Sequence, residues 1–239
     1  FLKYPDNSAG SIMTAEYLSL KQEMEVHDAF DYIRANGQDS ETIYDLFVTD
    51  SERHLEGVIT IKDLLMHPYE TRIGDIMETN VIKCVTTDDQ EDVAELFTHY
   101  DLLSLAVVDR ENRLVGIVTV DDAVDVMEDE ATEDIEKMAA IIPTERPYFK
   151  TSVLDTWKSR IPWLMLLMVS ATFTGIIITK FEDALAACVA LTGFIPMLMD
   201  TSGNSGSQAS VTVIRAMSLG DVEFKDILRV IWKEIRVAA

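Results

Sequence analysis

A stretch of dense acidity runs from Asp121 to Asp134 and contains no Lys or Arg. On a helix, the three- and four-residue spacing of Glu130, Glu133 and Asp134 puts their carboxylates on one face, where they repel one another. A bound cation or a basic neighbour would offset this repulsion. Because no His or Cys accompanies these oxygen ligands, the pattern favours Mg²⁺ or Ca²⁺ over Zn²⁺. The alternative interpretation is a solvated acidic helix face, the usual explanation of a run of charge.

Other chemistries fit the sequence less well. The acidic run is not an EF-hand, because it lacks the loop glycine and the terminal Glu in register. It also lacks two isolated carboxylates in an apolar setting, as glycoside hydrolysis would require. The histidines, His27, His54, His67 and His99, are scattered and none accompanies a plausible Ser or Cys nucleophile. We therefore predict that the chain is not an enzyme.

A second group of polar residues interrupts an apolar region. Ile161–Thr179 carries no charge over roughly the length that a bilayer needs and predicts a membrane helix, and Ala184–Met199 predicts another. The polar segment Asp200–Gln208 follows, where lipid would disfavour it, so we expect a continued or broken helix that faces protein or water. Its Asn204 and Gln208 are candidate pore-lining residues, because their carbonyls can contact a hydrated cation. The alternative is a polar loop outside the bilayer.

Composition supports two segregated parts. A formal net charge of -22 together with 48% hydrophobic residues is unusual for one soluble domain. Such acidity also argues against nucleic acid as a partner. Basic residues flank the two apolar runs, at Lys150, Lys158 and Arg160 before them and at Arg215, Lys225, Arg229, Lys233 and Arg236 after them. By the positive-inside bias, both ends are expected on the cytoplasmic side.

The acidic half contains an internal repeat with a period of about 60 residues. Gly10–Thr14 (G-S-I-M-T) recurs as Gly74–Glu78 (G-D-I-M-E), and Leu55–Asp63 (L-E-G-V-I-T-I-K-D) recurs as Leu114–Asp122 (L-V-G-I-V-T-V-D-D). Between these motifs, each copy shows the apolar periodicity of a β-α-β-β-α unit. The predicted strands are 17–20, 46–48 and 58–60 in the first copy and 81–84, 105–108 and 116–119 in the second.

The order of these elements, with the Ile-Met near the start and the Gly-apolar-apolar-Thr ending, resembles a CBS domain. The resemblance implies a pseudo-symmetric pair, whose members often bind adenosine nucleotides in the clefts. It places Thr60, Asp63, Thr119 and Asp122 at ribose- and phosphate-facing positions, and a helix N-terminus there would offer amides to phosphate. The alternative is that Thr60 and Asp63 only cap the following helix.

The tandem module, the acidic segment and the apolar runs with Pro196 and Gly203–Gln208 (G-N-S-G-S-Q) together resemble the MgtE family of magnesium transporters and channels. The resemblance spans essentially the whole chain. It implies a homodimer in the cell membrane, multi-pass, with cytoplasmic CBS domains and a pore that bound Mg²⁺ closes. The family's metal-ligand positions fall on acidic residues throughout: Asp89, Glu91, Asp101, Asp122, Glu130, Glu133 and Asp134.

The resemblance also implies a domain plan and a nucleotide site. Residues 1–10 end an N-terminal helical domain, 11–70 and 71–128 are the CBS domains, 129–156 form the connecting or plug helix, and 157–239 hold two membrane helices and a following amphipathic segment. For ATP, it points to Lys62 and Asp63 beside Thr60, although the family carries Arg where this chain has Lys62. Asp200 stands where a small residue is more usual. The first residues lack an initiating Met, so we expect a piece of a longer chain.

The alternative function is an adenine-nucleotide-sensing CBS module on a membrane protein that carries another cation, such as Co²⁺. The two hypotheses predict that different residues are needed for sensing. Nucleotide sensing would survive removal of the carboxylates of Glu130, Glu133 and Asp134, whereas Mg²⁺ sensing would not.

Overall fold

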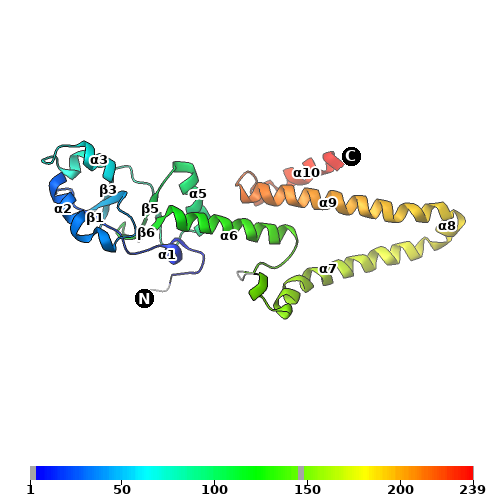
Figure 1. Cartoon of the computed structure of the whole chain (residues 1–239). Coiled ribbons are helices and arrows are strands. Elements are labelled where there is room, and N and C mark those ends of the chain that lie inside the picture. The colour runs from blue at the N-terminus through cyan, green and yellow to red at the C-terminus, as the bar shows by residue number, and fades with distance from the viewer. Residues whose placement is uncertain (1–3, 145–147, 239) are drawn as a thin grey trace. The chain divides into compact units, whose positions relative to one another are not determined.

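The computed structural model describes residues 4–144 and 148–238. The chain divides into two compact units, with the boundary between Glu128 and Asp129 inside one long helix. Figure 1 shows the first unit as the mixed helix and strand region and the second as helices alone.

The first repeat folds into the predicted β-α-β-β-α unit. Its elements are β1 (Ser19–Leu20), α2 (Val26–Asn36), the 3-10 helix η1 (Gly37–Asp39), β2 (Asp45–Thr49), β3 (Leu55–Thr60) and α3 (Ile61–Met66). The central strand β2 pairs in parallel with β1 and antiparallel with β3. Phe47 and Val58 lie opposite each other in the antiparallel pair.

The second repeat follows the same plan. Its elements are α4 (Ile73–Ile76), β4 (Lys83–Val85), α5 (Gln90–Tyr100), β5 (Ser104–Val108), β6 (Leu114–Thr119) and α6 (Val120–Met138). β5 pairs in parallel with β4 and antiparallel with β6. The pseudo-symmetry extends to an irregularity, because the register shifts between Val48 and Thr49 in one sheet and between Val107 and Val108 in the other.

The two repeats exchange their first segments. Thr14, just after α1 (Ala9–Ile12), exchanges backbone hydrogen bonds of 2.8 and 2.9 Å with Ile117 in the second sheet. In the opposite direction, Glu78 exchanges two bonds of 2.9 Å with Val58 in the first sheet. The segment that carries the repeated Gly-x-Ile-Met motif in each repeat therefore forms backbone hydrogen bonds with the sheet of the other repeat.

Glycine is required where these segments cross. A Cβ atom on Gly116 would lie 2.7 Å from both Met13 Sδ and the Thr14 carbonyl oxygen. At the equivalent Gly57, it would lie 2.6 Å from Met77 Sδ. The glycine of each Gly-apolar-apolar-Thr motif thus admits the methionine of the other repeat's first segment.

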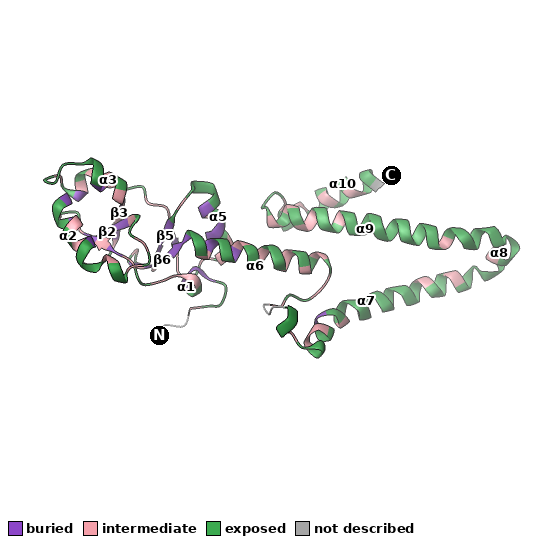
Figure 2. Cartoon of the chain, in the orientation of Figure 1, coloured by how far each residue is buried: buried purple, intermediate pink, exposed green. Residues whose placement is uncertain are grey.

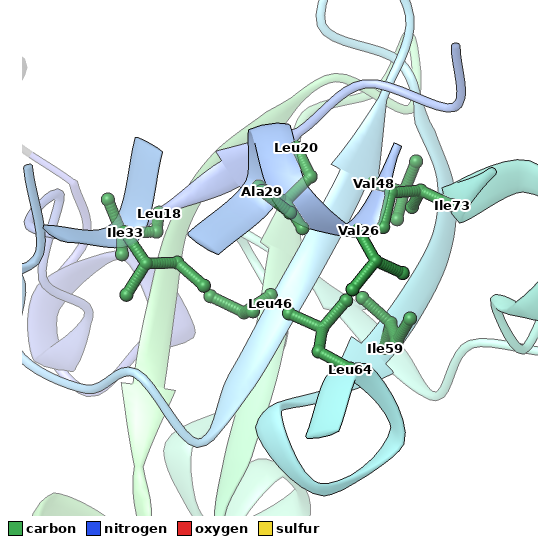
Figure 3. Close-up of a cluster of buried hydrophobic side chains, with 10 residues drawn as sticks. All are labelled: Leu18, Leu20, Val26, Ala29, Ile33, Leu46, Val48, Ile59, Leu64 and Ile73. Atoms are coloured by element: carbon green, nitrogen blue, oxygen red, sulfur yellow. The ribbon is translucent and has the colours of Figure 1, made fainter. Parts of the chain in front are cut away.

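Three hydrophobic clusters form the core of the first unit. The cluster in Figure 3 fills the space between the first sheet and its helices, and it includes Ile73 from α4 of the other repeat. A second cluster occupies the same place in the second repeat and includes Ala9 from α1. The third lies between the repeats and includes Phe47, whose full burial stabilises the fold by about 1.5–3 kcal/mol. Each central strand is buried on both faces for this reason.

Helix α6 is shorter than the predicted connecting helix over residues 129–156. It ends at Met138, and Ala140 adopts a left-handed conformation with φ 55°. The Ala140 N–H donates to the Lys137 carbonyl and the Ile141 N–H donates to the Glu136 carbonyl, both at 2.9 Å. These two bonds form a Schellman motif, which ends the helix. The proline that follows, Pro143, has no N–H with which to continue it. Residues 145–147 lie outside the described residues.

The second unit continues with long helices. They are η2 (Tyr148–Lys150), α7 (Val153–Lys180), α8 (Glu182–Ala187), η3 (Val189–Gly193), α9 (Phe194–Ser218), η4 (Phe224–Asp226) and α10 (Ile227–Ala238). Figure 2 shows that the surfaces of α7 and α9 are largely exposed, in contrast to the buried strands of the first unit. Among the described residues, α7 is the one helix long and apolar enough to cross a membrane.

The predicted second span over Ala184–Met199 is not a single helix. That run is divided between α8, the 3-10 helix η3 and the first turns of α9. Helix α9 is 25 residues long, enough for a bilayer, but its hydropathy is lowered by the polar segment around Asp200 and Asn204. The expectation of a continued helix through that segment is confirmed.

Candidate cation and nucleotide sites

The acidic face predicted on α6 is present. Because α6 is continuous through residues 130–134, Glu130, Glu133 and Asp134 project within one turn of one another. The face also holds a cation of its own, since Lys137 Nζ lies 2.5 Å from Glu133 Oε1. The pKa of Lys137 is raised, first by the hydrogen bond to Glu133 and also by the negative charges of Asp134 and Glu130.

Lys137 is the functional neighbour that the sequence reasoning missed. The repulsion argument allowed either a bound cation or a basic neighbour, and Lys137 is such a neighbour one turn further along α6. The signal was in the sequence, because Glu133 and Lys137 have the i, i+4 spacing of a stabilising helix pair. Such an exposed pair contributes only about 0.3–0.5 kcal/mol.

The remaining predicted metal ligands lie at helix ends in the first unit. Asp89 is the N-cap of α5, and its side chain accepts a 2.9 Å hydrogen bond from the Glu91 N–H. Asp101 ends the same helix in a left-handed conformation. Asp122 lies in the first turn of α6, where its carboxylate accepts a 3.1 Å bond from the Thr119 hydroxyl. Asp89 and Asp122 therefore serve helix capping in this structure.

The described residues contain no group of three or more His, Cys, Asp or Glu side chains that converges to hold a metal ion. Glu130, Glu133 and Asp134 share a helix face, but carboxylates on one such face lie side by side rather than pointing at a common centre. A hard cation such as Mg²⁺ retains several waters and takes only one or two protein carboxylates, so a shared helix face suits a hydrated ion.

The predicted nucleotide residues surround the start of α3. Thr60 is the N-cap, and its hydroxyl accepts from the Asp63 N–H at 3.1 Å and donates to Asp63 Oδ2 at 2.6 Å. These bonds form a capping box, which was the alternative interpretation of the pair. Lys62 lies between them and is exposed. The three residues are adjacent, as a nucleotide site would need, but Thr60 and Asp63 already bind each other.

A hollow that the sequence did not predict lies at the opposite end of β3 from Thr60. It is lined by Glu52, Arg53, Asp109 and Arg113, which belong to the two β-hairpin turns. The turns are joined across the pseudo-symmetry axis, since Leu55 N–H donates to the Asn112 carbonyl at 3.0 Å. Both charge signs are present, so this hollow has no clear preference for an anion or a cation.

The candidate pore residues lie on α9. Asn204 and Gln208 are four residues apart, so they share a helix face, and Asp200 is one turn earlier on it. Both side chains are exposed. Serine and glycine residues fill the opposite side of the same turns, which permits close helix packing.

The fold and these residues define the class of the protein: a tandem CBS-domain protein that continues into an acidic helix and a long apolar helix. The CBS-domain profile matches residues 9–70 and 73–129, and the profile of the MgtE divalent cation transporter family matches residues 195–239. The chain belongs to the MgtE family, as the sequence resemblance predicted.

Known proteins agree with this assignment. The magnesium transporter MgtE of Thermus thermophilus is 40% identical over 235 residues, which are 98% of this chain and 52% of that protein. Three curated relatives match this chain over nearly all of its residues, and the chain spans about half the length of each of them. Those relatives are transporters, which agrees with the prediction that the chain is not an enzyme.

Solved structures match the first unit. The cytosolic domain of the Mg²⁺ channel MgtE in complex with ATP is 43% identical, with a TM-score of 0.51, over 52% of this chain and 50% of that one. The soluble part of a magnesium transporter is 44% identical, with a TM-score of 0.54, over 54% of this chain and 51% of that one. The tandem CBS fold predicted from the repeat is thereby confirmed.

Proposed function

We propose that the chain is the sensing part and the beginning of the membrane part of a Mg²⁺ transporter, in which cytosolic Mg²⁺ closes the pore. Its family membership and its similarity to proteins named magnesium transporters support the transported ion. The observation that carries the sensing role is the acidic face of α6, where the carboxylates of Glu130, Glu133 and Asp134 lie close enough to Lys137 to raise its pKa.

The mechanism is a shift between two states of different cation affinity. At high Mg²⁺, ions bind between the α6 carboxylates and those of the CBS modules and hold a homodimer closed. The ligand set is Asp89, Glu91, Asp101, Asp122, Glu130, Glu133 and Asp134. At low Mg²⁺, repulsion among these groups favours the open state. Since a ligand shifts an equilibrium only through differential affinity, the closed state must gather more carboxylates around each ion.

Limited proteolysis of residues 121–143 in the detergent-solubilised chain tests this role. We expect Mg²⁺ to slow cleavage in the millimolar range. The variant Glu130→Gln/Glu133→Gln/Asp134→Asn should shift the Mg²⁺ concentration for half-maximal protection at least about tenfold upward, as the loss of three charged ligands implies. A matched control, Glu23→Gln/Glu41→Gln/Glu70→Gln, removes three exposed negative charges elsewhere and should leave the midpoint unchanged. Equal midpoints in both variants would contradict the proposal.

We also propose that ATP binds beside Thr60, Lys62 and Asp63. The ATP complex of a 43% identical cytosolic domain supports this assignment. The variant Lys62→Ala removes an exposed charge without touching the capping box, so it should weaken ATP binding in isothermal titration while leaving thermal stability unchanged. Two results together would favour the nucleotide-sensing alternative. ATP would still protect the triple α6 variant from proteolysis, and Mg²⁺ would not protect the unmodified chain.

The membrane arrangement is the last part of the proposal. We place α7 across the cell membrane and the first unit on the cytoplasmic side, with α9 returning so that the protein is multi-pass. The apolar length of α7 and the basic residues before it support this orientation. Asn204 and Gln208 would then face the permeation path from α9.

A further inference from the structure

The last helix, α10 (Ile227–Ala238), has two chemically distinct faces. Arg229, Lys233 and Arg236 recur at intervals of four and three residues, so they share one side of the helix. The opposite side is apolar throughout and is formed by Ile227, Leu228, Ile231, Trp232 and Ile235. Three cations on one side of a helix are a strong local departure in a chain of net charge -22.

The apolar side of α10 is uncovered in the described residues of the second unit. Leu228 is 78% exposed, Trp232 62% and Ile235 56%. Figure 2 shows the helix largely in the colour of exposed residues. A soluble protein would not leave so much contiguous apolar surface in water without an occupant.

Helix α10 does not suit the hydrocarbon core itself. Its charged residues Arg229, Lys233, Glu234 and Arg236 recur along the helix. Charges at these intervals are costly at the bilayer centre. A helix with a basic side, an apolar side and an interfacial tryptophan lies in the plane of the membrane surface.

The turn before α10 supports this placement. Gly220 has φ 69° and donates its N–H to the Met217 carbonyl at 3.0 Å, so the chain leaves the axis of α9 there. The following Phe224 is 79% exposed and is a candidate for a second aromatic anchor. Just before the helix, Lys225 and Glu223 neutralise each other at 2.6 Å. Asp226 lies 3.5 Å from Arg229 and offsets part of the charge of the basic side.

We propose that α10 lies flat on the cytoplasmic surface of the bilayer and binds anionic lipid head groups through Arg229, Lys233 and Arg236. The inference rests on the proposed function only in placing α7 across the membrane, because that placement sets the side on which α10 emerges. Anionic lipids of the cytoplasmic leaflet attract clustered Lys and Arg at the surface, each of which strengthens binding severalfold. The occupant of the apolar side is then the upper acyl-chain region.

Tryptophan quenching by brominated lipids tests the placement. The chain carrying Trp157→Phe and Trp163→Phe keeps Trp232 alone, and it is reconstituted in phosphatidylcholine with or without phosphatidylglycerol. We expect strong quenching by bromines near the head-group end of the acyl chain and weak quenching by bromines near its tail. Strongest quenching near the tail would overturn the proposal in favour of a span, and no quenching in either lipid would mean that protein covers Trp232.

Charge variants test the lipid preference. In Arg229→Gln/Lys233→Gln/Arg236→Gln, quenching at the phosphatidylglycerol fraction that is half-saturating for the unmodified chain should fall severalfold, because three surface cations are lost. The matched control Arg34→Gln/Arg72→Gln/Arg110→Gln removes three exposed cations from the first unit and should leave this quenching unchanged. Quenching in the unmodified chain that does not depend on the phosphatidylglycerol fraction would also overturn the proposal. A chain that keeps Trp163 alone reports whether α7 is in the bilayer, so failure of α10 binding and failure of the membrane placement are told apart.

Discussion

Lys137 Nζ lies 2.5 Å from Glu133 Oε1, one turn along the helix that carries the acidic face. Lys137 is therefore a covalently attached cation among the carboxylates that we propose as Mg²⁺ ligands. A tethered ammonium and a dissolved ion compete for the same oxygen atoms. The affinity of the sensor is then set by the difference between these two interactions rather than by the carboxylates alone.

Replacing this ammonium should strengthen Mg²⁺ binding. In Lys137→Met, Glu133 loses its competitor and one positive charge near Glu130 and Asp134 disappears. An exposed i, i+4 pair is worth about 0.3–0.5 kcal/mol, so we expect roughly a twofold lower Mg²⁺ midpoint in the proteolysis assay. Arg34→Met, which breaks the exposed Arg34–Asp31 pair in the first repeat, should leave the midpoint where it is. A higher midpoint in Lys137→Met would mean that Lys137 orders the site rather than competing for it.

The sequence predicted the acidic face but not how the ligands come together. Glu130, Glu133 and Asp134 are related by local helix geometry, which spacing alone determines. Asp89 and Asp122 are committed to helix capping in the described structure. Bringing such separate carboxylates around one ion depends on tertiary and quaternary arrangement, and no local pattern encodes it.

The same limit applies to the fold. The recurring motifs and the apolar periodicity between them identified both β-α-β-β-α repeats, because these patterns are local in the sequence. They did not reveal that Thr14 pairs with Ile117, since that contact joins segments far apart in the sequence. The second apolar run, 184–199, was wrongly read as one helix because its composition is uniform, whereas the backbone changes to a 3-10 helix at Val189–Gly193.

The exchange of first segments predicts unequal effects at two equivalent glycines. Gly116→Ala should destabilise the first unit by about 1–3 kcal/mol, because its new Cβ would meet a backbone oxygen, that of Thr14, at 2.7 Å. Gly57→Ala should cost less, because its closest contact is the flexible Met77 side chain and the nearest backbone oxygen, that of Glu78, is 3.1 Å away. Hydrogen exchange of the strand amides in the full chain measures both losses.

A second substitution separates side-chain from backbone crowding. Adding Met77→Ala to Gly57→Ala removes the crowding sulfur and should recover part of the lost protection. Adding Met13→Ala to Gly116→Ala leaves the Thr14 oxygen in place and should recover little. Equal recovery in both pairs would show that the backbone contacts are not limiting.

The turn between β2 and β3 predicts a pH dependence. The Asp50 carboxylate binds the His54 side chain at 2.8 Å and accepts from two backbone N–H groups of the same turn, and the side-chain bond is the largest cause of its lowered pKa. Stability from a lowered pKa is fully present above the unfolded value of about 3.9 and is lost as pH falls through the folded value. Asp50→Asn should therefore be less stable than the unmodified chain at pH 7, with a difference that narrows below about pH 4. Thermal unfolding across this range measures it, and a constant difference would contradict the assignment.

The two cysteines provide a test of membrane orientation. Cys84 is 3% exposed, and burial raises the pKa of its thiol to about 12, so it should react very slowly with maleimide at neutral pH while the first unit is folded. Cys188 is exposed between α8 and η3, at the turn that we place on the outer side of the membrane. In intact cells, a membrane-impermeant maleimide should therefore label the chain, and Cys188→Ser should abolish labelling while Cys84→Ser does not. Labelling of Cys188 only after the cells are opened would reverse the proposed orientation of α7, because the thiol would then face the cytoplasm together with the basic residues that precede the span.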